Sequence, residues 1–238
     1  MKVTALAGGV GAGKFLRGLV RAVPPEDVTV VVNTGDDIDV HGLHVSPDLD
    51  SVTYWLGGAA DRERGWGREG ETFRTTEELG AFGAVGAWFG LGDLDLATHL
   101  VRTKALADGM PLSEATALII RRFGIRCRIL PMSDQRVTTR VEAADERGQA
   151  LDLHFQEYWV QRKAADHVKA IRYEGAAAAR PAPGVLEAIA RADVLLVCPS
   201  NPVASIDPIL AVPGVAAAIS GRRDVTAGIS PIVGGTPL

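Results

Sequence analysis

The chain has 238 residues, of which 47% are hydrophobic and 23% charged, a composition typical of a globular protein that buries a core. Its length suits one large domain or two small ones. Its formal net charge of -4 at pH 7 gives no general electrostatic reason to bind nucleic acid or an anionic membrane, so we expect small-molecule partners held at a local site.

The first predicted elements form a β-α-β unit. Residues 3–6 are typical of a short apolar strand, residues 7–13 of a glycine-rich loop, and residues 14–23 of a helix with apolar positions at helical spacing. The run "VTVVVNTGDD" that follows is continuous and β-branched at its start, as in parallel strands that are buried on both faces.

The middle of the chain is less regular. We interpret "WLGGAADRERGWGREGETF" as a surface excursion because glycine and charge dominate it. Three helices are predicted in "TTEELGAFG", "LDLATHLVRTKALADG" and "PLSEATALIIRRFG". Strands are predicted in "RCRILPMS", in "VTTRVEAADERGQALDLHFQ" as a pair joined by the turn "DERGQ", and in "VKAIRYEG".

The end of the chain repeats the opening scheme. Pro183 is expected to start a helix, "VLLVC" to form a buried strand with a polar loop after it, and "VTAGISPIVGG" to form a last strand and loop. The whole pattern predicts an α/β fold, a single Rossmann-like domain over residues 1–238 with a mostly parallel sheet and a mainly helical insertion at about 55–125. Loops at the carboxyl ends of such strands bind ligands.

The opening loop comes close to two phosphate-binding motifs and matches neither. It contains G-x-x-x-x-G-K, but Phe15 stands where a Walker loop needs a hydroxyl group, and it reads G-x-G-x-G where the dinucleotide fingerprint needs G-x-G-x-x-G. Glycines still let backbone N–H groups approach an anion at a helix N-terminus. The expected phosphate-binding residues are Gly8, Gly9, Gly11, Gly13 and Lys14. A tight turn without a ligand is the alternative.

Aspartates are concentrated after the second predicted strand, at Asp36, Asp37, Asp39, Asp48 and Asp50. Carboxylates there share a sheet edge with the glycine loop, and Mg²⁺ takes carboxylate oxygens while it bridges substrate phosphates. We therefore expect a magnesium site beside the phosphate site. In the alternative, Asp48 caps a helix that starts after Pro47, and Asp39 is merely solvated.

Two further polar groups stand out. Asp95, His99 and Arg102 share one helical face, which we interpret as an exposed ion-pair ladder. Polar side chains in "PSNPVASI" follow a buried strand and suit hydrogen bonding to a base or a ribose, with a capping turn as the alternative. These side chains are Ser200, Asn201 and Ser205. The segments "MSD" and "HFQEYW" indicate no function on their own.

Cys127 and Cys198 lie inside apolar runs without CxxC spacing, which favours buried free thiols in a reducing cytosol. The N-terminus lacks a basic segment followed by a long apolar run, and no stretch reaches about 18 apolar residues. We expect a cytoplasmic enzyme.

Taken in order, several blocks resemble the 2-phospho-L-lactate transferase family (CofD-like proteins) of coenzyme F420 biosynthesis. They are "GGVGAGKFLRGL", "VVNTGDD", "HGLHVSPDLDSVTYWLGG", "GWGREGETF", "WFGLGDLDLATHLVRT", "ILPMSDQ", "HFQEYWV" and "CPSNPVASIDPIL". The resemblance covers essentially the whole chain. It implies a Mg²⁺-dependent transfer of a phosphorylated three-carbon acid from its guanosine diphosphate derivative to the ribityl hydroxyl of the deazaflavin Fo, with GMP as the leaving group.

The resemblance also implies roles for residues. Gly9, Gly11 and Lys14 would hold the diphosphate, and the "SNPVAS" loop would hold guanosine. Asp36, Asp37 and Asp50 would bind the cation, with Asp50 and Asp36 as the catalytic pair. Asp93 and His99 would contact substrate, and the chain would form a homodimer.

Two departures from the family are visible. Leu94 follows Asp93 where family members often carry a basic residue, and family chains usually continue well past "SPIVGG", so the family's C-terminal part is expected to be absent here. A non-enzymatic regulator that binds a nucleotide sugar is the main alternative, because a related family shares the glycine loop and "NTGDD". A dehydrogenase ranks third. The choice among phospholactate, phosphoenolpyruvate and phosphoglycerate donors stays open.

Overall fold

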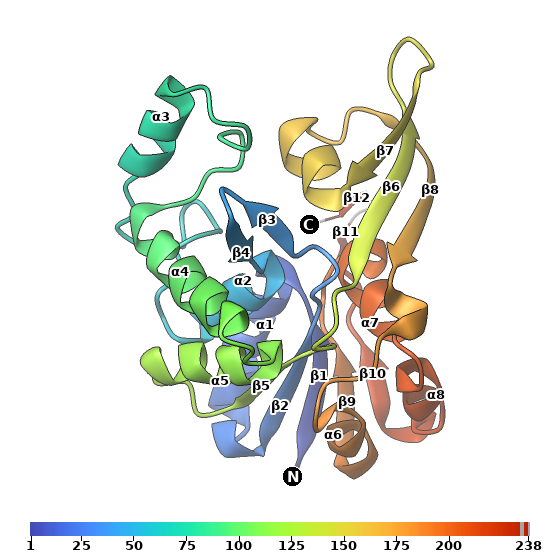
Figure 1. Cartoon of the computed structure of the whole chain (residues 1–238). Helices are drawn as coiled ribbons and strands as arrows, with labels where there is room; N and C mark the ends of the chain where they lie inside the picture. The colour runs from blue at the N-terminus through green and yellow to red at the C-terminus, as the bar shows by residue number, and fades with distance from the viewer. Residues whose placement is uncertain (234–235, 238) are drawn as a thin grey trace.

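A parallel sheet forms the centre of the computed structural model, which describes residues 1–233 and 236–237 (Figure 1). Its strands run in the spatial order β10-β9-β1-β2-β5. Numbered along the chain, this is the 3-2-1-4-5 arrangement of a Rossmann sheet. The strands are β1 (Val3–Ala7), β2 (Val28–Val32), β5 (Arg128–Pro131), β9 (Val194–Val197) and β10 (Thr226–Gly228). The predicted α/β, Rossmann-like fold is confirmed.

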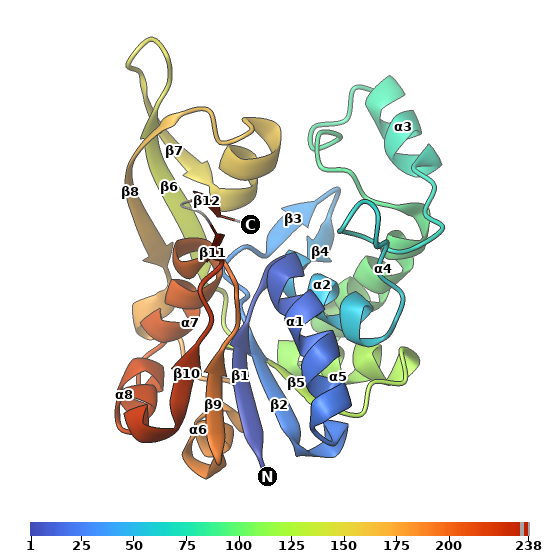
Figure 2. The ribbon, with the colours of Figure 1, turned by 180° about the vertical axis from the view of Figure 1, so that it is seen from behind.

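Helices cover both faces of this sheet, which is why its strands are apolar throughout (Figures 1 and 2). Alternate residues of β1 and β2 enter two separate cores. The first core packs against α1 (Gly9–Ala22), α2 (Pro47–Leu56) and α5 (Leu112–Arg122). The second packs against α6 (Val185–Arg191), α7 (Asp207–Ala211) and α8 (Val215–Ser220).

The segments between β2 and β9 supply most of the remaining elements. A hairpin of β3 (Ile38–Val40) and β4 (Leu43–Val45) follows β2. Helices α3 (Arg74–Ala81) and α4 (Asp93–Ala107) precede α5, in the stretch where three helices were predicted. A second, antiparallel sheet has the order β7-β6-β8. Its strands are β6 (Thr138–Ala144), β7 (Ala150–His154) and β8 (His167–Glu174), and the predicted β6–β7 hairpin is confirmed.

Short elements complete the described part of the chain. β11 (Ile232–Val233) pairs with β12 (Thr236–Pro237). The single-turn helices are η1 (Pro25–Asp27), η2 (Glu157–Gln161), η3 (Ala176–Ala178), η4 (Pro202–Ile206) and η5 (Arg223–Val225). Within the described residues, no helix combines the length and the apolar character that crossing a bilayer requires.

One local prediction was wrong, and one element was not predicted. Residues 7–13 were predicted as a loop, but α1 already begins at Gly9, so most of the glycine run forms the first turn of the helix. The β3–β4 hairpin was not predicted, because its turn depends on left-handed backbone at His41 (φ 52°) and Gly42 (φ 75°), and the former is not a usual turn signal.

Candidate active site

The glycines after β1 allow three segments to meet at the carboxyl edge of the sheet. A Cβ atom on Gly8 would lie 2.2 Å from Asp48 Oδ2, and one on Gly11 would lie 2.4 Å from the carbonyl oxygen of Pro199. A Cβ on Gly13 would lie 2.6 Å from the Trp55 ring. The glycines therefore serve close packing of α1 against α2 and against the loop after β9, where the Gly8 N–H donates to Ser200 Oγ at 3.1 Å.

Asp48 places an internal carboxylate at the N-terminus of α1. Its Oδ2 accepts a hydrogen bond from Asn33 Nδ2 at 2.9 Å, and the Ser205 hydroxyl and the Gly9 N–H, which lie close to the carboxylate, also act to lower its pKa. The alternative in which Asp48 caps its own helix is wrong, because Ser46 is the N-cap residue and Asp48 faces the glycine turn instead. Burial raises the pKa of Asp48 to about 6, against the effect of these hydrogen bonds.

Asp36 lies beside Asp48 and shares a donor with it. Asn33 Nδ2 lies 3.1 Å from Asp36 Oδ1, and Gln156 Nε2 donates to Asp36 Oδ2 at 3.0 Å. The side chain is buried, and burial raises its pKa well above the usual range. The neighbouring carboxylates of Asp48 and Asp37 act in the same direction.

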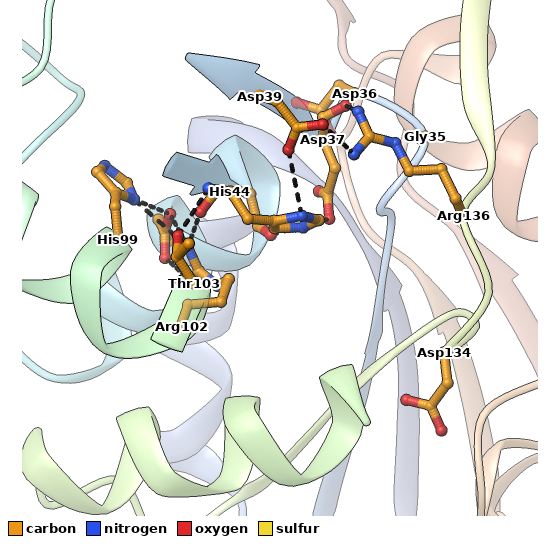
Figure 3. Close-up of polar contacts among 12 residues, drawn as sticks. Gly35, Asp36, Asp37, Asp39, His44, His99, Arg102, Thr103, Asp134 and Arg136 are labelled. Atoms are coloured by element: carbon orange, nitrogen blue, oxygen red, sulfur yellow. Dashed lines mark hydrogen bonds and ion pairs between the residues drawn. The ribbon is translucent and has the colours of Figure 1, made fainter. Parts of the chain in front are cut away.

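Asp37 completes this group of carboxylates. Its Oδ2 accepts from Ser46 Oγ at 2.8 Å and contacts His44 Nε2 at 2.9 Å (Figure 3). Its Oδ1 is buried and has no hydrogen-bond partner among the described residues. We refer to Asp36, Asp37 and Asp48 as the carboxylate cluster.

His44 is held between two aspartates and helix α4. Its ring Nδ1 lies 3.6 Å from Asp39 Oδ1, which is itself exposed and paired with Arg136 (Figure 3). Its backbone N–H donates to Thr103 Oγ1 at 2.8 Å. Helix α4 therefore fixes the histidine that contacts Asp37.

The carboxylate cluster has the chemistry of a cation site without forming a complete cage. Among residues 1–233 and 236–237, no three His, Cys, Asp or Glu side chains have the geometry to hold a metal ion by themselves. Mg²⁺ commonly uses one or two protein carboxylates and fills its remaining positions with water and phosphate oxygens. Asp37 Oδ1 has no partner among the described residues, and burial beside other carboxylates raises the pKa values of Asp36 and Asp48, so a cation bound here would offset charge that the protein leaves unpaired. Asp37 also lines a cavity of about 140 Å³, which leaves room for water.

Asp50 belongs to a different group from the carboxylate cluster. Arg102 of α4 binds both of its carboxylate oxygens, one of them at 3.0 Å, and His99 Nδ1 lies 3.6 Å from Asp50 Oδ2. Arg102 is 2% exposed and Asp50 4%. The predicted metal set of Asp36, Asp37 and Asp50 is therefore not brought together as one group.

The polar face of α4 is buried, so its interpretation as an exposed ion-pair ladder was wrong. His99 lies between the two acids, with its Nε2 3.6 Å from Asp95 Oδ1. Asp95 in turn accepts a hydrogen bond from the hydroxyl of Tyr54. This network ties α4 to α2 behind the carboxylate cluster.

Three other predicted site residues use their side chains within the protein. The carboxylate of Asp93 accepts from Thr72 and from the Thr75 N–H at the start of α3, and these hydrogen bonds lower its pKa to about 2. Asn201 Oδ1 accepts from two N–H groups of η4 at 3.0 Å each, as the capping alternative predicted. Lys14 is exposed, with its Nζ 5.5 Å from the centre of the Trp55 ring.

Sequence reasoning missed the part that β7 plays in the site. Gln156 binds Asp36, and His154 Nε2 lies 3.1 Å from the carbonyl oxygen of Asp37. Both belong to "HFQEYW", whose only signal was a run of polar groups at a strand end. Asp134 of "MSD" accepts from the Ser113 N–H at 2.7 Å and thereby caps α5.

Comparisons with known proteins agree with the resemblance seen in the sequence. The model of the family described as "2-phospho-L-lactate transferase CofD" matches residues 3–237. A phosphoenolpyruvate transferase of Streptomyces griseus is 53% identical over 100% of this chain and 74% of its own length. The phosphoenolpyruvate transferases of Thermobifida fusca and Mycolicibacterium smegmatis are 48% and 45% identical, and the chain covers 76% of each.

A solved structure supports the fold alone. A protein of the UPF0052 family from Bacillus halodurans superposes with a TM-score of 0.61 at 22% identity. The match covers 92% of this chain and 64% of that protein. The chain therefore spans less than two thirds of the length of that structural neighbour.

Proposed function

The chain belongs to the 2-phospho-L-lactate transferase CofD family, and from this membership we propose its reaction. It transfers a phospho-carboxylic acid group, of the 2-phospho-L-lactate or phosphoenolpyruvate type, from a guanosine diphosphate derivative to the ribityl hydroxyl of Fo. GMP leaves, and the product is an intermediate of coenzyme F420. Relatives named phosphoenolpyruvate transferase, about half identical over the whole chain, support the phosphoenolpyruvate donor.

The carboxylate cluster is the observation that supports a reacting centre here. It lies between the glycine turn with Ser205 on one side and the end of β7 on the other. Two substrates that meet at this cluster can approach it from opposite sides, which suits an in-line displacement at phosphorus. A non-enzymatic nucleotide-sugar regulator is not favoured, because the family and its named relatives are transferases.

The protein's own groups suit the activation of a hydroxyl nucleophile. Asn33 and Gln156 hold Asp36 from both sides, so its carboxylate is fixed in orientation. A carboxylate fixed in this way can accept the proton of a hydroxyl group that lies within hydrogen-bond reach. In this proposal Asp36 accepts the proton of the attacking ribityl hydroxyl. The hydroxyl oxygen forms a bond to phosphorus while the bond between that phosphorus and the GMP oxygen breaks.

The cluster would hold Mg²⁺ through Asp36, Asp37 and Asp48, and the ion when bound supplies charge neutralisation to the diphosphate. Asp50 has a positioning role in this proposal, because Arg102 occupies both of its oxygens. Gly9, Gly11 and Lys14 are proposed to lie along the diphosphate, with Ser200 and Ser205 toward guanosine. We also propose a cytoplasmic location and a homodimeric state. The molar mass in solution, measured by light scattering, tests the homodimer.

The reaction is tested by incubating the protein with Fo, Mg²⁺ and each guanylylated three-carbon acid in turn. We expect GMP to appear in equal amount with a phospho-acid ester of Fo, identified by mass. Release of GMP at the same rate without Fo would indicate a hydrolase. No GMP from any of the donors would overturn the proposal.

A further inference from the structure

An aromatic platform lies next to the carboxylate cluster. The rings of Phe155 and Trp159 stack with centroids 6.0 Å apart and an angle of 13° between their planes. Phe155 is partly buried, whereas Trp159 is 54% exposed on η2, the helical turn that follows β7. In Figures 1 and 2 this turn lies on the side of the second sheet that faces α3. One flat indole face is thus held in a fixed orientation and remains open to solvent.

The platform is fixed to the cluster through its immediate neighbours. His154 and Gln156, the residues on either side of Phe155, contact the Asp37 carbonyl oxygen and the Asp36 carboxylate. Both side chains are buried. The distance between the platform and the carboxylates is therefore set by two buried contacts and by the four-residue step from Phe155 to Trp159.

The opposite side of the cluster is built from different segments. Asn33 Nδ2 links Asp36 to Asp48 and to the carbonyl oxygen of Ala204, and Asp48 contacts Ser205 and the glycine turn. The residues proposed for the nucleotide are all on that side. The platform lies on the β7 side, where no residue is proposed for the nucleotide, so it is available to the acceptor substrate.

We propose that Trp159 is the stacking platform for the tricyclic ring of the deazaflavin acceptor. This inference rests on the proposed function and names a residue that determines acceptor binding. Stacking of a heteroaromatic ring on an exposed tryptophan is favourable for any flat π-system. Phe155 orients the indole of Trp159 before the ligand binds, so the Trp159 side chain loses little conformational freedom on binding.

The test measures equilibrium binding of Fo without donor, by ligand fluorescence, to the wild type and three variants. Trp159→Leu should weaken Fo binding about five-fold or more, the lower end of what loss of one stacking partner produces. Trp159→Phe keeps a flat ring and should remain within about three-fold of the wild type. The matched control is Phe82→Leu, because Phe82 is an aromatic residue 85% exposed on the turn after α3. It should bind as the wild type does, and GDP affinity should be the same in all four proteins.

The outcomes separate this inference from the proposed function. If the wild type binds Fo and Trp159→Leu binds it equally well, the platform is wrong while the function stands. If Trp159→Leu loses affinity for GDP instead, the ring over Trp159 is guanine and the assignment to the acceptor is wrong. If the wild type does not bind Fo, both proposals fail. In turnover, Trp159→Leu should raise the KM for Fo and leave kcat and the KM for the donor near their wild-type values.

Discussion

The buried ion pair between Arg102 and Asp50 makes a strong prediction about stability. Arg102→Leu would leave the Asp50 carboxylate 4% exposed and without the guanidinium that binds both its oxygens. An uncompensated buried charge of this kind costs about 3–5 kcal/mol. The free energy of unfolding, measured with urea at pH 7, should fall by that amount.

Two further variants decide whether the charge is the cause. The double variant Asp50→Leu with Arg102→Leu should recover most of the loss, because a buried pair can often be replaced by apolar groups at little net cost. Arg191→Leu breaks an exposed pair with Glu187 and should cost less than about 1 kcal/mol. If Arg102→Leu loses no more than Arg191→Leu, or if the double variant is no more stable than the single one, this account of the pair is refuted.

Other predictions concern the carboxylate cluster. Because Asp48 binds its proton more tightly in the folded state, with a pKa of about 6, the free energy of unfolding should rise as pH falls from 7 to 5. Its share over this window is about 1.4 kcal/mol, from the one pH unit below the folded-state pKa, and Asp48→Asn should show a smaller rise in urea titrations. Mg²⁺ at about 100 times its Kd should stabilise the fold by about 2.7 kcal/mol. Asp37→Asn should lose most of this effect in thermal denaturation, and an unchanged response would place the cation elsewhere.

The sheet could be predicted from the sequence because its signals are local. A continuous β-branched run marks β2, and a continuous apolar run marks β9, as strands buried on both faces, and the structure pairs each of them with β1. The helices followed from apolar spacing in the same way. Helix α4 is an exception, because the face that it buries is not the apolar one. Its Leu100 and Val101 are exposed, whereas His99 and Arg102 are buried. Apolar spacing gives no information about a helix face whose burial depends on ion pairs.

The site was less predictable because its contacts join distant segments. Gln156 and Asp36 are 120 positions apart, and no spacing rule connects them. The separation of Asp48 from Asp50 follows from their positions on one helix. Two positions apart on α2, the two side chains point in different directions, Asp48 toward Asn33 and Asp50 toward Arg102. The register of this helix therefore assigns Asp48 and Asp50 to different groups of side chains.

The central claim is that the carboxylate cluster is the reacting centre of a transferase, and Asp36→Asn tests it most directly. The measurement is the single-turnover rate of GMP release with Fo, Mg²⁺ and the phosphoenolpyruvate-type donor, with Asp39→Asn as the matched control on the exposed neighbour. We expect Asp36→Asn to remain folded, to bind Fo normally and to lose roughly 100-fold or more in rate, while the control stays within a few-fold of the wild type. A folded Asp36→Asn protein that transfers at the wild-type rate would contradict the account.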